Sequence, residues 1–128
     1  MRFCLKNPQS SDIIRVKVKN DIYHYGIYIS DDEVIAYGKA SDIFKTEKEN
    51  VKVISTNIKE FLDGHFLETA EYTFIEKCKK NKPDKIINLA KSRLGEAKYD
   101  ILNNNCEHFV NECVFNKHVS LQVDKFKK

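Results

Sequence analysis

The chain of 128 residues predicts one α+β domain, in which helices pack on one face of a small antiparallel sheet. Short segments of alternating polarity, separated by turn residues, come first along the chain. Longer segments with helical spacing come last. A chain of this length buries roughly two-thirds of its unfolded surface, which is enough for a core without disulfides. We expect one domain over residues 1–128, with its core at about 12–123.

Three predicted strands occupy the first part of the chain. Residues 12–18 alternate apolar and basic side chains, as expected of a half-buried strand. Residues 22–30 are rich in tyrosine and isoleucine, and residues 33–37 form a short third strand. The pairs Asn20-Asp21 and Asp31-Asp32 are turn signals, so the three strands predict an antiparallel meander.

Two more strands and a short helix are predicted in the middle of the chain. Residues 51–55 and 72–75 predict two more strands. Between them, a polar side chain at 55–57 caps a short helix that stops near Gly64.

Two longer helices end the chain. Pro83 suits the first position of a helix that Gly95 stops. The last helix begins near Cys106, and the lysine-rich end, Lys125–Lys128, is predicted to be frayed.

Composition excludes several classes of protein. The net charge of +3 is too small to indicate a nucleic-acid partner, and the aromatic residues are not interleaved with basic ones. No segment approaches the ~20 apolar residues of a transmembrane helix. The first residues contain no apolar signal-peptide region, so we expect a cytoplasmic protein. The four cysteines are irregularly spaced and are expected to be reduced.

Cys106 stands where a reactive thiol is expected. It follows three asparagines, Asn103–Asn105, and precedes an apolar-periodic segment. In the first turn of a helix, free N–H groups and the positive end of the macrodipole stabilise a thiolate. The alternative is a cysteine that only packs in the core, which is common on the apolar face of a helix.

A nucleophilic cysteine needs a base, and His24 is the best-placed histidine. It lies in the middle of a predicted strand and shares a face with Gly26, which leaves space beside the imidazole. His108 points about 200° around the helix from Cys106, and His65 and His118 lie in predicted loops. The alternative for His24 is a structural histidine. Spacings among the cysteines and histidines match no zinc pattern, and we expect neither a metal nor a cofactor.

Two segments resemble the signature motifs of the lecithin:retinol acyltransferase-like family. His24-Tyr25-Gly26-Ile27-Tyr28-Ile29 is similar to its histidine motif. Asn105-Cys106-Glu107-His108-Phe109-Val110 is similar to its cysteine motif, in the same order along the chain. The resemblance implies a circularly permuted papain-like fold, related to NlpC-type peptidases, in which the nucleophile opens a C-terminal helix.

The resemblance also implies a chemistry. Cys106 is the nucleophile, His24 is the general base, and the substrate is a glycerophospholipid or another acyl ester that forms a thioester on the cysteine. The backbone N–H of Cys106 is expected to hold the oxyanion. Acyl transfer and phospholipase-type hydrolysis both fit this scheme. A lipid substrate implies a transient contact with a membrane surface.

One position departs from the family. The third polar residue, often a histidine, is expected twelve residues after His24, where this chain has Ala36. Alanine cannot orient an imidazole. Tyr37 substitutes only if a bulge shifts the register by one residue. The alanine keeps open a non-catalytic interaction module with a degraded site. A second alternative, with the same thiol, base and fold, is a cysteine amidase or peptidase of the NlpC type.

Overall fold

A six-stranded antiparallel sheet forms the centre of the computed structural model, which describes residues 1–44 and 50–127. The strands lie in the order β1-β6-β2-β3-β4-β5. Their bounds are β1 Arg2–Cys4, β2 Ile13–Lys19, β3 Ile22–Ser30, β4 Glu33–Tyr37, β5 Val53–Thr56 and β6 Leu67–Glu71. The meander predicted from the sequence is confirmed as β2, β3 and β4.

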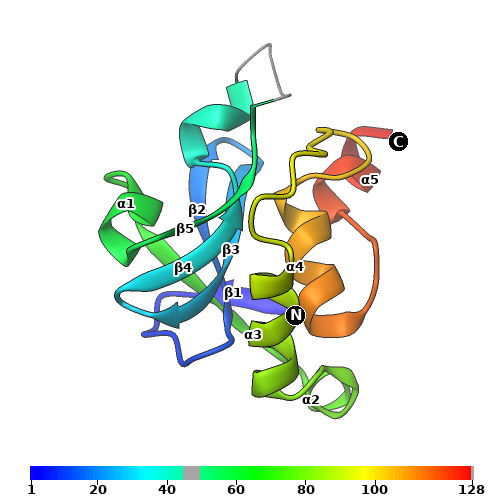
Figure 1. The fold of residues 1–128 in the computed structure, drawn as a ribbon. Helices are drawn as coiled ribbons and strands as arrows, with labels where there is room; N and C mark the ends of the chain where they lie inside the picture. The colour runs from blue at the N-terminus through cyan, green and yellow to red at the C-terminus, as the bar shows by residue number, and fades with distance from the viewer. Residues whose placement is uncertain (45–49, 128) are drawn as a thin grey trace.

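Helices cover both faces of the sheet. Figure 1 shows α3 and α4 along one side and the short α1 on the other. The bounds are α1 Ile58–Leu62, α2 Phe74–Lys79, α3 Pro83–Ser92, α4 Cys106–Phe115 and α5 Leu121–Lys127, with a 3-10 helix, η1, at Ala40–Phe44. The α+β class is confirmed. The sequence predicted helices on one face only, whereas α1 adds a second layer of packing on the opposite face.

Local sequence signals account for the helix ends. Asn57 caps α1 by accepting a hydrogen bond from the N–H of Glu60. Pro83 occupies the first turn of α3, as predicted. Asn105 caps α4, and the helix begins at Cys106, also as predicted.

Two predictions differ from the structure. The strand predicted at 72–75 is wrong, because Thr73 and Glu76 form a capping box that starts α2. Strand β6 lies just before it and pairs with β1 and β2, two partners distant in sequence. The end predicted to be frayed forms α5 as far as Lys127, while Lys128 lies outside the described residues.

Alternation along β3 divides the core into two layers. Tyr25 and Ile27 face α3 and α4 in the larger apolar cluster. The opposite face of the sheet carries Val34, Ala36 and the Phe61 side chain of α1. Because successive side chains of a strand point to opposite faces, His24 and Gly26 lie on the α1 side.

Gly26 is the point at which α1 approaches β3. A Cβ atom at Gly26 would lie 2.8 Å from the Phe61 ring and 3.1 Å from Val34. The space that Gly26 leaves is therefore filled by Phe61, whose ring also stacks on the imidazole of His24. Both the layer beneath α1 and the position of His24 depend on this glycine.

We expect Gly26→Ala to lower the free energy of unfolding by about 1–3 kcal/mol, because the added methyl group overpacks the Phe61 contact. Denaturant unfolding measures the loss. The matched control is the double variant Gly26→Ala/Phe61→Leu, in which the smaller side chain makes room. Its loss should be smaller than the sum of the two single losses. Simple additivity would show that Phe61 is not the obstacle.

Candidate active site

The site begins where β4 leaves β3. Their last paired residues are Gly26 and Ala36. Gly38, with a φ of 76°, then turns the chain into η1. Among the residues that the structure describes, no strand pairs with the edge of β3 before Gly26 on the β4 side.

Backbone groups of Tyr23 and Tyr25 point to this open edge. Backbone groups of Tyr28 bond with Ser11 and Asp12 on the β2 side. Because hydrogen-bonding directions alternate along an antiparallel strand, the odd-numbered residues point the other way. The N–H of Tyr23 accordingly donates to the side chain of Gln122 in α5. Elements from the C-terminal part of the chain thus cover the edge that β4 leaves free.

Cys106 meets the same edge at the first turn of α4. Its Sγ lies 3.8 Å from the carbonyl oxygen of Tyr23. The Asn105 side chain accepts hydrogen bonds from the N–H groups of Glu107 and His108, so the cap leaves the N–H of Cys106 outside its reach. The predicted placement of the thiol at a helix N-terminus is what the structure shows.

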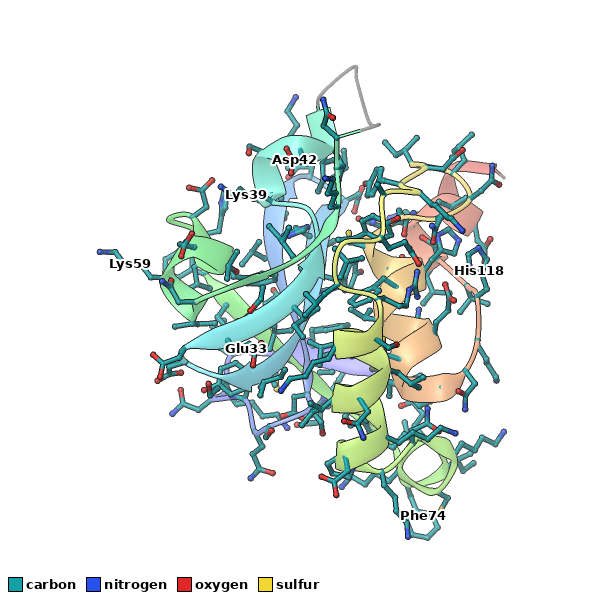
Figure 2. All side chains as sticks on the ribbon, in the orientation of Figure 1. Glu33, Lys39, Asp42, Lys59, Phe74 and His118 are labelled. Atoms are coloured by element: carbon teal, nitrogen blue, oxygen red, sulfur yellow. The ribbon has the colours of Figure 1, made fainter. Side chains whose placement is uncertain are left out.

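His108 has a structural part in this turn. Its Nδ1 accepts a hydrogen bond from the N–H of Asn105, which completes the capping box. Its ring stacks on His118 at a centroid distance of 4.3 Å. His118 in turn contacts Glu112 and lies on the side of α4 away from the sheet (Figure 2). Both rings thus stabilise the first turn of α4.

His24 lies buried on β3, one residue from the backbone that Cys106 contacts. Its ring stacks on Phe61 with centroids 5.1 Å apart. Its Nδ1 is buried and has no hydrogen-bond partner among the residues described. No hydrogen bond described here joins this imidazole to the thiol of Cys106. The two side chains approach this part of β3 from different faces: His24 stacks on Phe61 on the α1 side, whereas Cys106 belongs to the apolar cluster on the α4 side. Proton transfer between them remains a proposal.

The third position is apolar in the structure as in the sequence. Ala36 is buried on the α1 side in regular register with Gly26. Tyr37 lies on the opposite face, where its ring packs against Tyr99 and its hydroxyl accepts a hydrogen bond from the N–H of Lys98. No bulge shifts Tyr37 toward His24, so the substitution considered from the sequence does not occur.

Asp42 is the charged group that the sequence did not indicate. It lies on η1 at the top of the molecule (Figure 2), and its carboxylate accepts a hydrogen bond from the N–H of Lys39. Burial lowers the pKa of His24, and the charge of Asp42 and the backbone of Gly38 act against that lowering. The third polar residue was expected twelve residues after His24, which is Ala36 on β4. The Asp42 carboxylate comes from η1, the next element along the chain.

Burial makes both reactive groups neutral. It lowers the pKa of His24 from 6.5 to about 4, against the opposing effects of Asp42 and Gly38. Burial also raises the pKa of the Cys106 thiol to about 12, although the backbone N–H groups of Tyr25, Cys106 and Glu107 lower it. The helix N-terminus acts in the direction predicted from the sequence, but desolvation is larger. At neutral pH the resting pair is a thiol and an imidazole.

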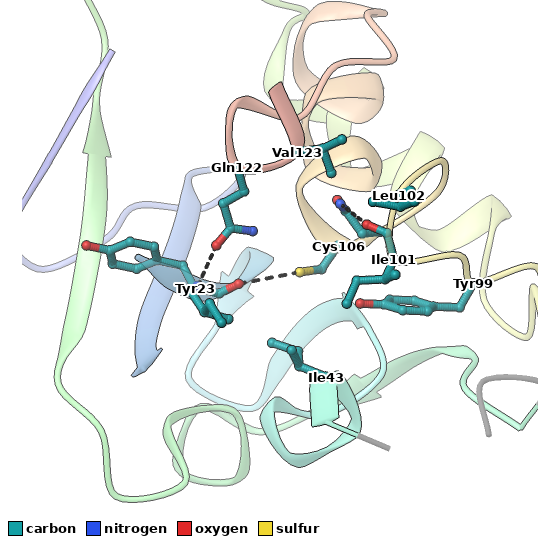
Figure 3. Close-up of a pocket in the computed structure, with 10 residues that line it drawn as sticks. Tyr23, Ile43, Tyr99, Ile101, Leu102, Cys106, Gln122 and Val123 are labelled. Atoms are coloured by element: carbon teal, nitrogen blue, oxygen red, sulfur yellow. Dashed lines mark hydrogen bonds between the residues drawn. The ribbon is translucent and has the colours of Figure 1, made fainter. Parts of the chain in front are cut away.

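An apolar pocket of about 270 Å³ opens on Cys106 (Figure 3). Its walls come from β3, η1, the segment before α4 and the start of α5. The lining residues are Ile22, Tyr23, Ile43, Tyr99, Ile101, Leu102, Asn105, Cys106, Gln122 and Val123. Such a pocket suits an apolar ligand that carries a few polar atoms near the thiol.

The cysteines, possible metal ligands and possible membrane-spanning helices can be assessed over the described residues. All four cysteines are free thiols. Over residues 1–44 and 50–127, no three histidine, cysteine or acidic side chains are grouped as metal ligands. None of the helices described is long and apolar enough to span a lipid bilayer.

Comparison with known proteins agrees with the two motifs. A family model described as "Lecithin retinol acyltransferase" matches residues 6–119. The chain belongs to the lecithin retinol acyltransferase family. Lecithin retinol acyltransferases of Homo sapiens and Rattus norvegicus are each 28% identical to it over 134 residues. The alignments cover 90% of this chain and 58% of each relative, so the chain spans little more than half of their length.

The buried state of His24 predicts a pH-dependent stability. Because its pKa in the folded protein is about 4 and its ordinary value is 6.5, the unfolded chain takes up the proton first as the pH falls. Stability present above pH 6.5 should be lost between about 6.5 and 4, by up to about 3 kcal/mol.

Urea unfolding at several pH values tests this. The His24→Phe variant should lose this part of the pH dependence, since phenylalanine does not titrate. The control variant His65→Gln should keep it. Equal pH profiles for the wild type and His24→Phe would contradict a buried neutral imidazole.

Proposed function

We propose that this protein is a cysteine-dependent acyltransferase or acyl hydrolase that carries the acyl group as a thioester on Cys106. The observation that supports this most is the apolar pocket that opens on the Cys106 thiol. An acyl chain lying in the pocket would place its carbonyl carbon beside Sγ. The relatives are named for lecithin, retinol and acyl transfer, and we propose a glycerophospholipid or another fatty acyl ester as the donor here.

In the proposed first step, His24 acts as the general base. Among the described residues its buried Nδ1 has no hydrogen-bond partner, so this nitrogen could accept a proton once the thiol reaches it. Catalytic hydrogen bonds often form fully only with substrate bound, so the absence of this contact in the free protein is compatible with the role. Because the thiol pKa is about 12 and the imidazole pKa about 4, proton transfer would accompany attack on the carbonyl.

The later steps use the same groups. Sγ bonds to the carbonyl carbon, and the Cys106 N–H donates to the oxyanion. His24 then gives its proton to the leaving alcohol as the carbon–oxygen bond breaks, which leaves a thioester. Water, an alcohol or an amine loses a proton to His24 and attacks the thioester. The carbon–sulfur bond then breaks, and Sγ takes the proton back from His24. We propose that the Asp42 charge stabilises the intermediate imidazolium in place of the polar residue absent at Ala36.

The apolar pocket favours an acyl substrate over the peptide substrate of the NlpC-type alternative. A peptide substrate of an NlpC-type peptidase presents many polar backbone groups, and the walls of the pocket offer few partners for them. A non-catalytic module would need no reactive thiol at all. Both alternatives are outcomes of the next experiment.

A p-nitrophenyl ester with a medium-length acyl chain should acylate Cys106, and intact-protein mass spectrometry should show one adduct. Cys106→Ala should form none, and His24→Ala should react about 10²–10⁴-fold more slowly. The matched control is Cys113→Ala. Cys113 is a second buried thiol of α4 whose pKa burial also raises to about 12, but it does not line the pocket.

Loss of the adduct in Cys113→Ala but not in Cys106→Ala would overturn the assignment. An unmodified wild-type protein would favour the non-catalytic module. Reaction with peptide esters alone would favour the peptidase.

We also propose that the mouth of the pocket touches the lipid surface. Ile101 and Leu102 line the pocket and are 48% and 51% exposed. Apolar side chains at such a position can enter the headgroup region while an acyl chain passes into the pocket. This contact would be transient.

The double variant Ile101→Ser/Leu102→Ser should therefore hydrolyse phosphatidylcholine in vesicles more slowly, by about tenfold or more. Its rate with a soluble short-chain ester should change much less. The control is Phe66→Ser, which removes an 87% exposed aromatic ring that does not line the pocket. An equal loss on both substrates would show damage to the site and not to membrane contact.

A further inference from the structure

The tetrahedral intermediate of acyl transfer commonly needs two hydrogen-bond donors, and the backbone N–H of Cys106 supplies one. The N–H of Cys106 is available at the start of α4, outside the Asn105 cap. A second donor must lie about 2.7–3.1 Å from the same oxyanion. Gln122, near the start of α5, is the polar side chain that faces Cys106 across the pocket (Figure 3).

Tyr23 places this amide beside the thiol. Its N–H donates to Oε1 of Gln122 at 2.6 Å, and its carbonyl oxygen lies 3.8 Å from the Sγ of Cys106. The N–H and C=O of one strand residue point to the same edge of the strand. The two side chains therefore bind neighbouring atoms of a single residue, and Figure 3 shows the amide nitrogen of Gln122 turned to the side of the sulfur.

The same hydrogen bond decides which end of the amide faces the pocket. The N–H of Tyr23 requires an acceptor, so the oxygen of Gln122 must lie against the strand. The NH₂ group is then directed away from Tyr23. Among the described residues it has no hydrogen-bond partner. A donor held in position with its protons uncommitted is what an oxyanion site requires.

Glu107 holds the start of α5 against α4. Its buried carboxylate accepts hydrogen bonds from the hydroxyl of Ser120 at 2.7 Å and from the backbone N–H of Gln122 at 3.0 Å. Since Glu107 directly follows the nucleophile, the backbone of Gln122 is tied to the same helical turn as Cys106. Its side chain is tied to β3. Both ends of the residue are therefore fixed before substrate binds.

We propose that Gln122 is the second oxyanion donor and hence a catalytic residue, an inference that depends on the proposed acyl chemistry. As Sγ bonds to the carbonyl carbon, the carbonyl π pair moves to oxygen. The N–H of Cys106 and the NH₂ of Gln122 donate to that oxygen. The pair returns when the bond to the alcohol breaks, and the alcohol takes the proton from His24. Gln122 itself exchanges no proton.

Two thiol reagents separate this role from a structural one. Acylation of Cys106 by a p-nitrophenyl ester passes through an oxyanion, whereas alkylation by iodoacetamide does not. In Gln122→Glu, one carboxylate oxygen can still accept from the Tyr23 N–H, but the other cannot donate. We expect acylation by Gln122→Glu and Gln122→Ala to fall about 10²–10³-fold, in kcat more than in KM. Alkylation should stay within about threefold of the wild type.

The control variant is Leu121→Ala, the neighbouring residue of α5, which is exposed and does not line this pocket. It should change neither rate. Gln122→Glu that acylates at the wild-type rate would overturn the inference, as would equal losses of acylation and alkylation, which indicate a structural role. A wild-type protein that is not acylated on Cys106 would instead overturn the proposed function itself.

Discussion

The candidate site depends on the edge of β3 that β4 leaves unpaired. Strand β4 follows β3 only as far as Ala36, and Gly38 turns the chain away. Backbone groups of a strand must bond with something. Here the N–H of Tyr23 bonds with Gln122, and its carbonyl lies against the thiol of Cys106. The gap in the sheet thus determines where α4 and α5 are attached and which side chains meet.

Without substrate, burial shifts the pKa of Cys106 more than the helix N-terminus does. A first-turn cysteine is expected to have a lowered pKa, yet burial raises that of Cys106 to about 12 and lowers that of His24 to about 4. A neutral pair avoids the cost of burying two charges without substrate. The ionised forms would then arise only during reaction, when an oxyanion and its donors share the charge.

Packing against Phe61 positions the His24 ring more than any polar partner among the described residues does. Phe61 stacks on its ring, and Gly26 is the residue that allows Phe61 to reach that place. Members of the family usually have a polar residue at the position of Ala36. In this chain packing orients the ring, and the charge of Asp42 acts on it from η1. The ring contact and the charge therefore come from different elements, α1 and η1.

Local patterns in the sequence determined a large part of this protein. Alternation and turn residues predicted the meander of β2, β3 and β4, and Pro83 and Asn105 predicted where α3 and α4 begin. These signals act between residues close in the chain, so they can be read without the fold. Thr73 and Glu76 also formed such a signal, but the apolar segment around them predicted a strand. Family membership followed from the motifs around His24 and Cys106.

Only the tertiary structure decided the rest. Strand β6 pairs with two strands distant in sequence, so no local pattern specified its neighbours. Asp42 and Gln122 come from η1 and α5, outside both motifs, and nothing in their own sequence marks them. Burial, which determines the ionisation of His24 and Cys106, is a property of the packed molecule. The sequence by itself proposed the thiol of Cys106 and the imidazole of His24 as the reactive groups, whereas folding decided their ionisation, their neighbours and the pocket beside the thiol.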